Sequence, residues 1–184
     1  MTFKREDFII YDVQSAYRKM EGELMENGEE EISADVWIPE LIKDMEKGMK
    51  VKLSPNGGSM LPFIVGGRDE VFLVLPDRLK RGDVVLYRRN TGKYVLHRIH
   101  HIHKKEREQF YLIGDSQVEI EGPLEREQMI GVAESFIRKG KHFSKNHIGY
   151  RIWYKMWLFM RPLRPQLIHL WWGVHKLFGK DCYK

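Results

Sequence analysis

The sequence predicts a mainly β protein, in which a compact antiparallel β domain lies between two helical extensions. Three observations lead to this prediction. The composition, with 42% hydrophobic and 31% charged residues in 184, is that of an ordinary globular domain. Short runs rich in Val, Ile, Tyr and Phe fill the middle of the chain. On either side of these runs, apolar residues instead recur at helical spacing.

Residues 1–48 are expected to form an acidic, helical N-terminal extension. Apolar residues recur roughly at helical spacing over residues 8–24, and "ENGEEE" then interrupts the pattern. A second helix is predicted over about residues 39–47, because proline suits a first helical position and Gly48 suits the position just past the end. Its apolar face would contain Leu41, Ile42 and Met45.

Residues 49–140 are expected to form the β domain. "RRNTGKY" is typical of a hairpin connection, and "KKERE" suggests a second one. Six short strands in about 90 residues predict an antiparallel sheet that bends into a partly closed barrel. The predicted strands are "KVKL", "DEVFLVL", "DVVLYRR", "KYVLHRIHHIH", "QFYLIG" and "IGVAESFIR".

Residues 148–178 are expected to form an amphipathic, helical C-terminal segment that contains four of the five tryptophans. Two apolar stretches of about 12 residues flank "RPLRP", and each is too short to span a bilayer. Basic residues alternate with Trp, Tyr and Leu, which is typical of a helix that lies in a membrane interface. A helical hairpin docked on the β domain and a groove for partner helices are the alternatives.

Charge and cysteine content limit the classes of function that the sequence allows. The net charge of +5 and the pI of about 9.2 favour an anionic partner such as a membrane surface. The single cysteine, Cys182, excludes a disulfide framework or a Cys-based zinc site within one chain. The N-terminus lacks the pattern of a secretory signal, and no run of about 20 apolar residues occurs. We therefore expect a cytoplasmic protein, peripheral at the membrane through residues 148–178, with no nucleic-acid partner and no cofactor.

The segment "GGSMLPF" places a single hydroxyl, Ser59, between residues that control backbone geometry. A serine needs a base to act as a nucleophile, because its free hydroxyl is barely ionised at neutral pH. The candidate base is His97 in "YVLHRI", since a neutral imidazole can accept the hydroxyl proton and return it to a leaving amine. Candidate acids to orient the imidazole lie downstream: Asp115, Glu119 and Glu121.

Strand alternation predicts that His97, Ile99, His101 and His103 share one face and that His100 lies on the other. Histidine is a common zinc ligand. However, His97 and His101 would lie about 13 Å apart along a regular strand, which is too far for one metal ion. The sequence therefore predicts no metal site.

The order of "GGSMLP", "RGDVVLY", "YVLHRI", "YLIGDSQ" and "IGV" resembles the signal peptidase I superfamily. This superfamily includes the bacterial leader peptidases, the endoplasmic-reticulum type and the self-cleaving repressor proteases. The resemblance covers roughly residues 50–137, about half of the chain. It implies a coiled antiparallel β domain of the signal peptidase/LexA-like type. It also implies a serine endopeptidase that cleaves leader or signal-like peptide segments.

The resemblance implies roles for particular residues. Ser59 matches the nucleophile, and His97 matches the general base, where many bacterial members carry lysine and the endoplasmic-reticulum type carries His-Arg. By spacing, Glu121 corresponds to the triad acid, while Asp115 supports the site or the fold; both remain candidates. Gly58 and Met60 flank the nucleophile and are the candidates for oxyanion binding and site support.

Two departures from the family pattern affect this interpretation. Leader peptidases often carry a hydroxyl residue two positions before the nucleophile, where this chain has Gly57. Loss of one oxyanion donor costs roughly 100- to 1000-fold in rate. The asparagine that commonly follows Gly-Asp is Ser116 here. The alternative function is therefore a catalytically inactive peptide- or membrane-binding module on the same fold.

Overall fold

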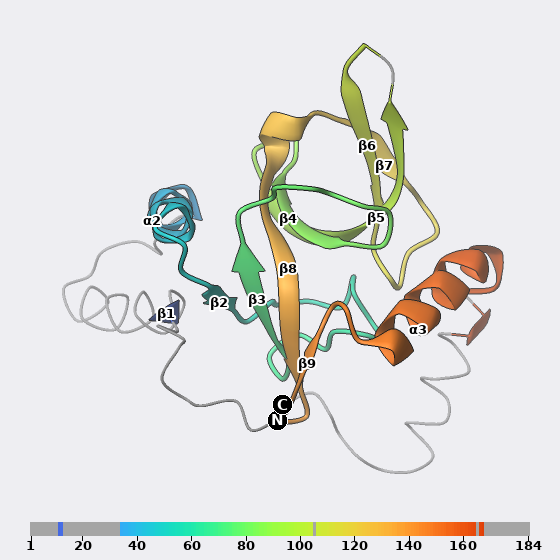
Figure 1. The fold of residues 1–184 in the computed structure, drawn as a ribbon. Coiled ribbons are helices and arrows are strands. Elements are labelled where there is room, and N and C mark those ends of the chain that lie inside the picture. The colour runs from blue at the N-terminus through green and yellow to red at the C-terminus, as the bar shows by residue number, and fades with distance from the viewer. Residues whose placement is uncertain (1–10, 13–33, 105, 165, 168–184) are drawn as a thin grey trace, which may run out of the picture.

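The computed structural model describes residues 11–12, 34–104, 106–164 and 166–167, and this part of the chain is mainly β (Figure 1). Nine strands form one sheet in the order β1-β2-β3-β8-β4-β5-β6-β7, and β9 pairs with β8 beside this path. All neighbours are antiparallel except β1 and β2, which run parallel. The described path does not close into a ring.

Helices α2 (Ala34–Glu46) and α3 (Ile148–Phe159) lie on opposite flanks of the sheet in Figure 1. Two short 3-10 helices are also present, η1 (Arg126–Gln128) and η2 (Arg161–Leu163). The strands are β1 (Tyr11–Asp12), β2 (Val51–Leu53), β3 (Glu70–Val74), β4 (Val84–Arg88), β5 (Tyr94–Lys104), β6 (Glu108–Ile113), β7 (Glu121–Leu124), β8 (Met129–Arg138) and β9 (Lys141–Ser144).

The six strands predicted from the sequence are confirmed as β2, β3, β4, β5, β6 and β8. Two further strands lacked a usable sequence signal. The sequence of β7 is "EGPL", and Gly and Pro are both depleted in strands. The sequence of β9 is "KHFS", a largely exposed strand without an alternating apolar pattern, which forms by pairing with the end of β8.

The helix predicted over residues 8–24 lies mostly outside the described residues, which include only Tyr11 and Asp12 before Ala34. Tyr11 and Asp12, which fall within the expected helical pattern, form β1 instead. The predicted second helix exists as α2, but it begins at Ala34, so Pro39 lies inside the helix and not at its first turn. Ile38, just before the proline, is buried with Leu41 and Met45, and this packing explains why the helix continues through a residue that removes one of its hydrogen bonds.

Two apolar clusters lie on the two faces of the sheet. The first combines α2, β2 and the loop that follows β2 with one face of β4 and β5 and with Tyr150 of α3. The second contains Val85, Tyr87, Ile99 and their neighbours on β6 and β8. Val85 pairs with His97 and Leu86 pairs with Leu96, so consecutive residues of β4 and β5 point into different clusters.

A fully buried ion pair connects these parts. Arg98 of β5 forms a bidentate pair with Asp115, with Nε–Oδ1 and Nη2–Oδ2 distances of 2.8 and 2.6 Å. Its Nη1 donates to the Gly82 carbonyl before β4 and to the Tyr150 hydroxyl on α3. Burial lowers the pKa of Arg98, but Asp115 and Tyr150 outweigh this effect, and the net shift is upward. The guanidinium therefore stays charged inside the fold.

Helix α3 packs one face against the domain and holds the Gly114–Gln117 turn, which is the "GDSQ" of the sequence. The Trp157 indole N–H donates to the Asp115 carbonyl at 2.8 Å. Arg164, also buried, donates to the carbonyls of Gly114 and Gln117 at 3.0 and 2.9 Å. Part of the tryptophan-rich segment thus packs internally, and residues 168–178 lie outside the described residues. No helix that the structure describes is long and apolar enough to cross a membrane.

We expect Arg98→Met to destabilise the protein by about 3–5 kcal/mol, because it leaves the buried Asp115 carboxylate without its counter-charge. The free energy of unfolding from urea denaturation measures the change. Arg107→Met, at an exposed position in the β5–β6 turn, is the matched control and should cost less than about 0.5 kcal/mol. Equal losses in the two variants would contradict the central role of this pair.

Candidate active site

Ser59 lies in the turn after β2, and its carbonyl is fixed by the Gly114–Gln117 turn. Gly57 has φ +89°, a left-handed conformation that glycine adopts without strain. The Ser59 carbonyl accepts two hydrogen bonds from Ser116, from its N–H at 2.9 Å and from its hydroxyl at 3.0 Å. A Cβ atom at Gly114 would lie 2.7 Å from the same carbonyl oxygen. Only glycine therefore permits this close approach.

The β5–β6 pairing connects His97 to this turn through its neighbour in the strand. Arg98, the next residue, pairs with Ile113 at the end of β6, and its side chain binds Asp115 in the Gly114–Gln117 turn. His97 therefore directly precedes the arginine that anchors the turn beneath Ser59, and its side chain projects to the opposite face of β5 from that arginine. Among the described residues, no hydrogen bond joins the Ser59 hydroxyl to the His97 ring. Such bonds are often long in ligand-free enzymes and tighten with substrate.

His97 is buried, and its ring is held by a side-chain network that the sequence did not reveal. The Tyr87 hydroxyl lies 3.1 Å from His97 Nδ1 and donates to Glu121 Oε2 at 2.6 Å. Arg89 makes a bidentate pair with the same carboxylate, in which Nε lies 2.8 Å from Oε2. Glu121 Oε1 is 3.6 Å from His97 Nδ1. The order of the network is therefore His97, Tyr87, Glu121, Arg89.

This arrangement selects one tautomer of His97. The Tyr87 hydroxyl has a single proton, which it gives to the Glu121 carboxylate. The contact between Tyr87 and His97 can then be a hydrogen bond only if His97 Nδ1–H donates to the Tyr87 oxygen. The neutral ring consequently carries its lone pair on Nε2. This is the tautomer that a general base requires.

Burial and charge set the ionisation of the network. Desolvation lowers the pKa of His97 from 6.5 to about 4, and the Glu121 charge opposes this shift only in part. Burial alone would raise the pKa of Glu121, but hydrogen bonds from Arg89 and Tyr87 outweigh it and keep the pKa below its ordinary value. Burial and the bond to Glu121 raise the pKa of Tyr87. At neutral pH His97 and Tyr87 are neutral, and Glu121 is ionised.

The structure separates the two candidate acids by position. Both oxygens of the Asp115 carboxylate bind Arg98, and no hydrogen bond within the described residues links that carboxylate to His97. Glu121 instead approaches His97 through Tyr87. Glu119, the third downstream acid, is exposed.

The remaining predicted site residues lie in the Ser59 turn. Met60 is buried in the first apolar cluster, and its carbonyl accepts the N–H groups of Phe63 and Ile64. Gly58 is exposed, and its carbonyl accepts the Leu61 N–H. These bonds shape a tight turn that presents Ser59 at its start.

A pocket of about 820 Å³ opens beside Ser59. Its apolar wall comes from four elements, namely α2, β2, β4 and β5, together with the Ser59 turn. Val95 and Leu96, directly before His97, belong to this wall, whereas His97 itself is not a lining residue. The apolar lining residues are Trp37, Leu53, Met60, Ile64, Leu86, Tyr94, Val95 and Leu96, and the polar ones include Asn56, Ser59, Arg88, Thr91 and Lys93.

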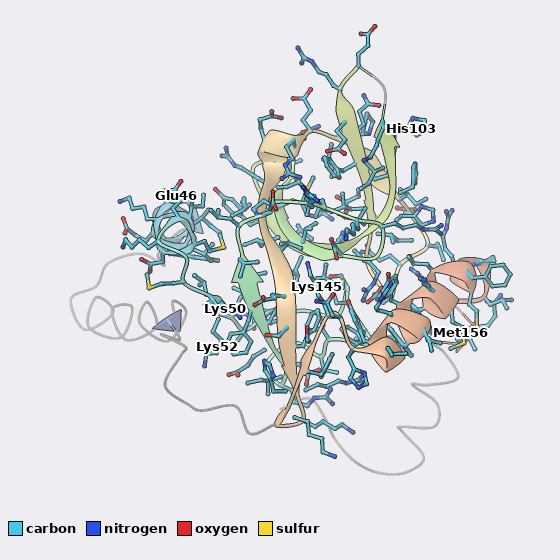
Figure 2. The ribbon with its side chains drawn as sticks, viewed as in Figure 1. Glu46, Lys50, Lys52, His103, Lys145 and Met156 are labelled. Carbon is cyan, nitrogen blue, oxygen red and sulfur yellow. The ribbon has the colours of Figure 1, made fainter. Side chains whose placement is uncertain are left out.

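The prediction that His101 and His103 share the face of His97 is wrong, because β5 contains a bulge. Ile99 pairs with Leu112 and His101 pairs with Tyr111, so His100 is an extra residue. Since Leu112 and Tyr111 point to opposite faces, His101 lies opposite Ile99 and His97. The ring of His101 stacks on Tyr111 with centroids 4.2 Å apart. His103 lies farther along the same hairpin (Figure 2). Within residues 34–104 and 106–164, no group of three or more His, Cys, Asp or Glu could hold a metal ion.

Comparison with protein-family models and with curated proteins finds no match for this chain. The geometry of the site is therefore the basis on which a function can be proposed.

Sequence reasoning missed Tyr87 and Arg89. Both occur in the strand run "DVVLYRR", where a tyrosine and an arginine are ordinary strand residues. Their signal is alternation: Val85, Tyr87 and Arg89 occupy every second position, and Val85 pairs with His97. That signal becomes informative only when the pairing of β4 with β5 is known.

Buried His97 should make stability depend on pH. Between pH 6.5 and 4 the unfolded chain binds the proton and the folded chain does not, so the free energy of unfolding falls as pH falls. The His97 contribution is about 1.4 kcal/mol per pH unit in this window. Urea unfolding at several pH values gives the free energy of unfolding of the wild type and of His97→Gln. The difference between these two free energies should change with pH at this slope. Ser59→Ala, which changes no titratable group, should keep the wild-type slope; an unchanged slope in His97→Gln would contradict the prediction.

The tautomer of His97 can be measured directly. We expect ¹⁵N NMR of histidine-labelled protein at pH 7 to show a protonated Nδ1 and an unprotonated Nε2 for His97. Tyr87→Phe removes the hydroxyl that accepts the Nδ1 proton, so the ring signals should move toward a mixture of tautomers. Tyr94→Phe, on the other face of the hairpin, is the control and should leave them unchanged. A wild-type ring protonated on Nε2 would disprove the network as described.

Proposed function

We propose that the protein is a serine endopeptidase with a coiled β domain of the signal-peptidase type, in which Ser59 is the nucleophile and His97 is the general base. One observation carries the proposal. A buried, neutral histidine, oriented through Tyr87 by an ionised carboxylate, directly precedes the arginine that binds Asp115 in the turn holding the Ser59 carbonyl. This is the arrangement of a base whose free nitrogen has been selected by its neighbours.

In the proposed reaction, Ser59 Oγ attacks the carbonyl carbon of the scissile peptide, while His97 Nε2 takes the hydroxyl proton. Glu121 stabilises the imidazolium that forms, acting through Tyr87. When the tetrahedral intermediate collapses, the C–N bond breaks and His97 returns the proton to the leaving amine. Water, deprotonated by His97, then releases the acyl group and restores Ser59.

The proposed oxyanion donors are backbone N–H groups of the Ser59 turn, including that of Met60. Gly57 supplies no hydroxyl, so these groups would act without the side-chain donor that many leader peptidases possess. Asp115 has a supporting role in this proposal, because Arg98 occupies its carboxylate.

The pocket beside Ser59 favours an extended peptide substrate with an apolar side chain next to the scissile bond. Leu53, Leu86 and Leu96 provide apolar walls, and Arg88 and Lys93 make part of the surroundings basic. Leader or signal-like segments, which combine short apolar and polar stretches, have this character.

A second candidate is a catalytically inactive peptide-binding module on the same fold. Two observations favour it: Gly57 lacks an oxyanion hydroxyl, and the Ser59 hydroxyl makes no hydrogen bond to His97 within the described residues. The pocket would then bind a peptide without cleaving it.

Peptide cleavage followed by mass spectrometry distinguishes the two. The wild type should cut members of a diverse peptide library that contains leader-like sequences. Ser59→Ala and His97→Ala should each lower the rate by at least about 100-fold, because each removes a group that acts in the chemical step. Cut sites should place apolar residues where the pocket lies.

Ser144→Ala is the control, since Ser144 is exposed on β9 and its hydroxyl accepts the Asn146 N–H. It should cleave as the wild type does. A folded wild type that cuts nothing, yet binds library peptides in the pocket, would replace the peptidase with the binding module. Cleavage that survives in Ser59→Ala would refute the proposed nucleophile.

A further inference from the structure

The outer face of α3 carries a continuous apolar stripe. Its members recur every three or four residues, which is the spacing of one helix face, and they extend from the first residue of α3 through η2. Figure 2 shows Met156 on the side of α3 that points away from the sheet. The stripe consists of Ile148, Ile152, Met156, Phe159 and Leu163, whose exposed fractions range from 50% for Met156 to 84% for Phe159.

This stripe is not the face of α3 that packs against the β domain. Tyr150, Trp157 and Leu158 are the buried residues of α3, and they dock the helix on the domain. Apart from Leu75 and Val118, at 40% and 38%, the exposed large hydrophobic residues of the described chain all belong to the stripe. An apolar patch concentrated in this way marks a surface that meets something other than water.

The charge around the stripe indicates the kind of partner. Residues 135–180 contain ten Lys and Arg residues and no Asp or Glu, although the whole chain contains 26 acidic residues. Arg151 and Lys155 lie on α3 beside the stripe and are exposed. A helix with an apolar stripe, basic flanks and no acidic residue complements an anionic lipid surface, where the stripe enters the acyl boundary and the cations meet the phosphates.

We propose that α3 and η2 dock the protein on anionic lipid bilayers, with α3 lying in the plane of the interface and the stripe of Ile148, Ile152, Met156, Phe159 and Leu163 inserted. This binding does not depend on peptidase activity. The helix is attached rigidly to the candidate active site, because Trp157 and Arg164 hold the Gly114–Gln117 turn on which Ser59 rests. Docking would therefore fix the position of the site relative to the membrane.

Flotation of the full chain with lipid vesicles tests the proposal. The protein should float with vesicles of phosphatidylglycerol and phosphatidylcholine at low salt, and binding to pure phosphatidylcholine should be weaker. The triple variant Ile152→Ser, Met156→Ser, Phe159→Ser should bind anionic vesicles at least about tenfold more weakly, since it removes most of the inserted apolar area. Arg151→Gln with Lys155→Gln should weaken binding about fivefold per charge on anionic vesicles only.

Phe159→Ser and Leu75→Ser form a matched pair of single substitutions at exposed apolar positions. Only Phe159→Ser should weaken vesicle binding, and thermal unfolding should show that both variants stay folded. Failure of the wild type to float at low salt would overturn the proposal. So would unchanged binding of the triple variant, which would move any lipid contact to another part of the chain.

Self-association is the competing explanation for an uncovered stripe. Analytical ultracentrifugation without lipid should therefore give a monomer for both the wild type and the triple variant. A wild-type dimer that becomes a monomer in the triple variant, with no vesicle binding, would show that a second copy covers the stripe and would overturn the proposal.

Discussion

The buried ion pair of Arg98 and Asp115 holds together three separate parts of the fold, namely β5, the loop that carries Ser59, and α3. Arg98 joins β5 to the turn before β4 through the Gly82 carbonyl, and to α3 through the Tyr150 hydroxyl. Asp115 holds the Gly114–Gln117 turn in place, and that turn holds the Ser59 carbonyl. Two charges removed from water are tolerated only when each is fully paired, and here every arm of the guanidinium has a partner. This requirement fixes the relative positions of strand, loop and helix.

Two adjacent residues of β5 serve opposite purposes because a strand alternates its faces. Arg98 points into the aromatic side of the core, close to Phe63 and Tyr150, and it remains charged there. His97 points to the other side, where burial makes the neutral ring the stable form. The network of Tyr87, Glu121 and Arg89 then determines which nitrogen of that neutral ring carries the proton. The alternation of β5 thus gives Arg98 a structural role on one face and places His97, the candidate base, on the other.

Helix α3 has a corresponding division between its two faces. Its inner face supplies Trp157 to the turn beneath Ser59, and Tyr150 to the buried ion pair. Its outer face is apolar with basic flanks. The same helix therefore stabilises the candidate site and presents a surface of different character to the outside. A contact made on the outer face would act on a body that is already rigidly joined to the site.

Six strands and the helix over residues 34–46, apart from its start, could be predicted from the sequence, which also singled out a turn serine and a strand histidine as candidate site residues. These features are local, because alternation, turn residues and short motifs each occur within a short stretch of the sequence. Tertiary structure alone decided which acid approaches His97, since the choice between Asp115 and Glu121 depends on which one Arg98 occupies. It also decided that Tyr87 lies between the ring and the carboxylate, and that a bulge turns His101 away from His97. Register and bulges depend on pairing between distant segments, and no short stretch of sequence contains that information.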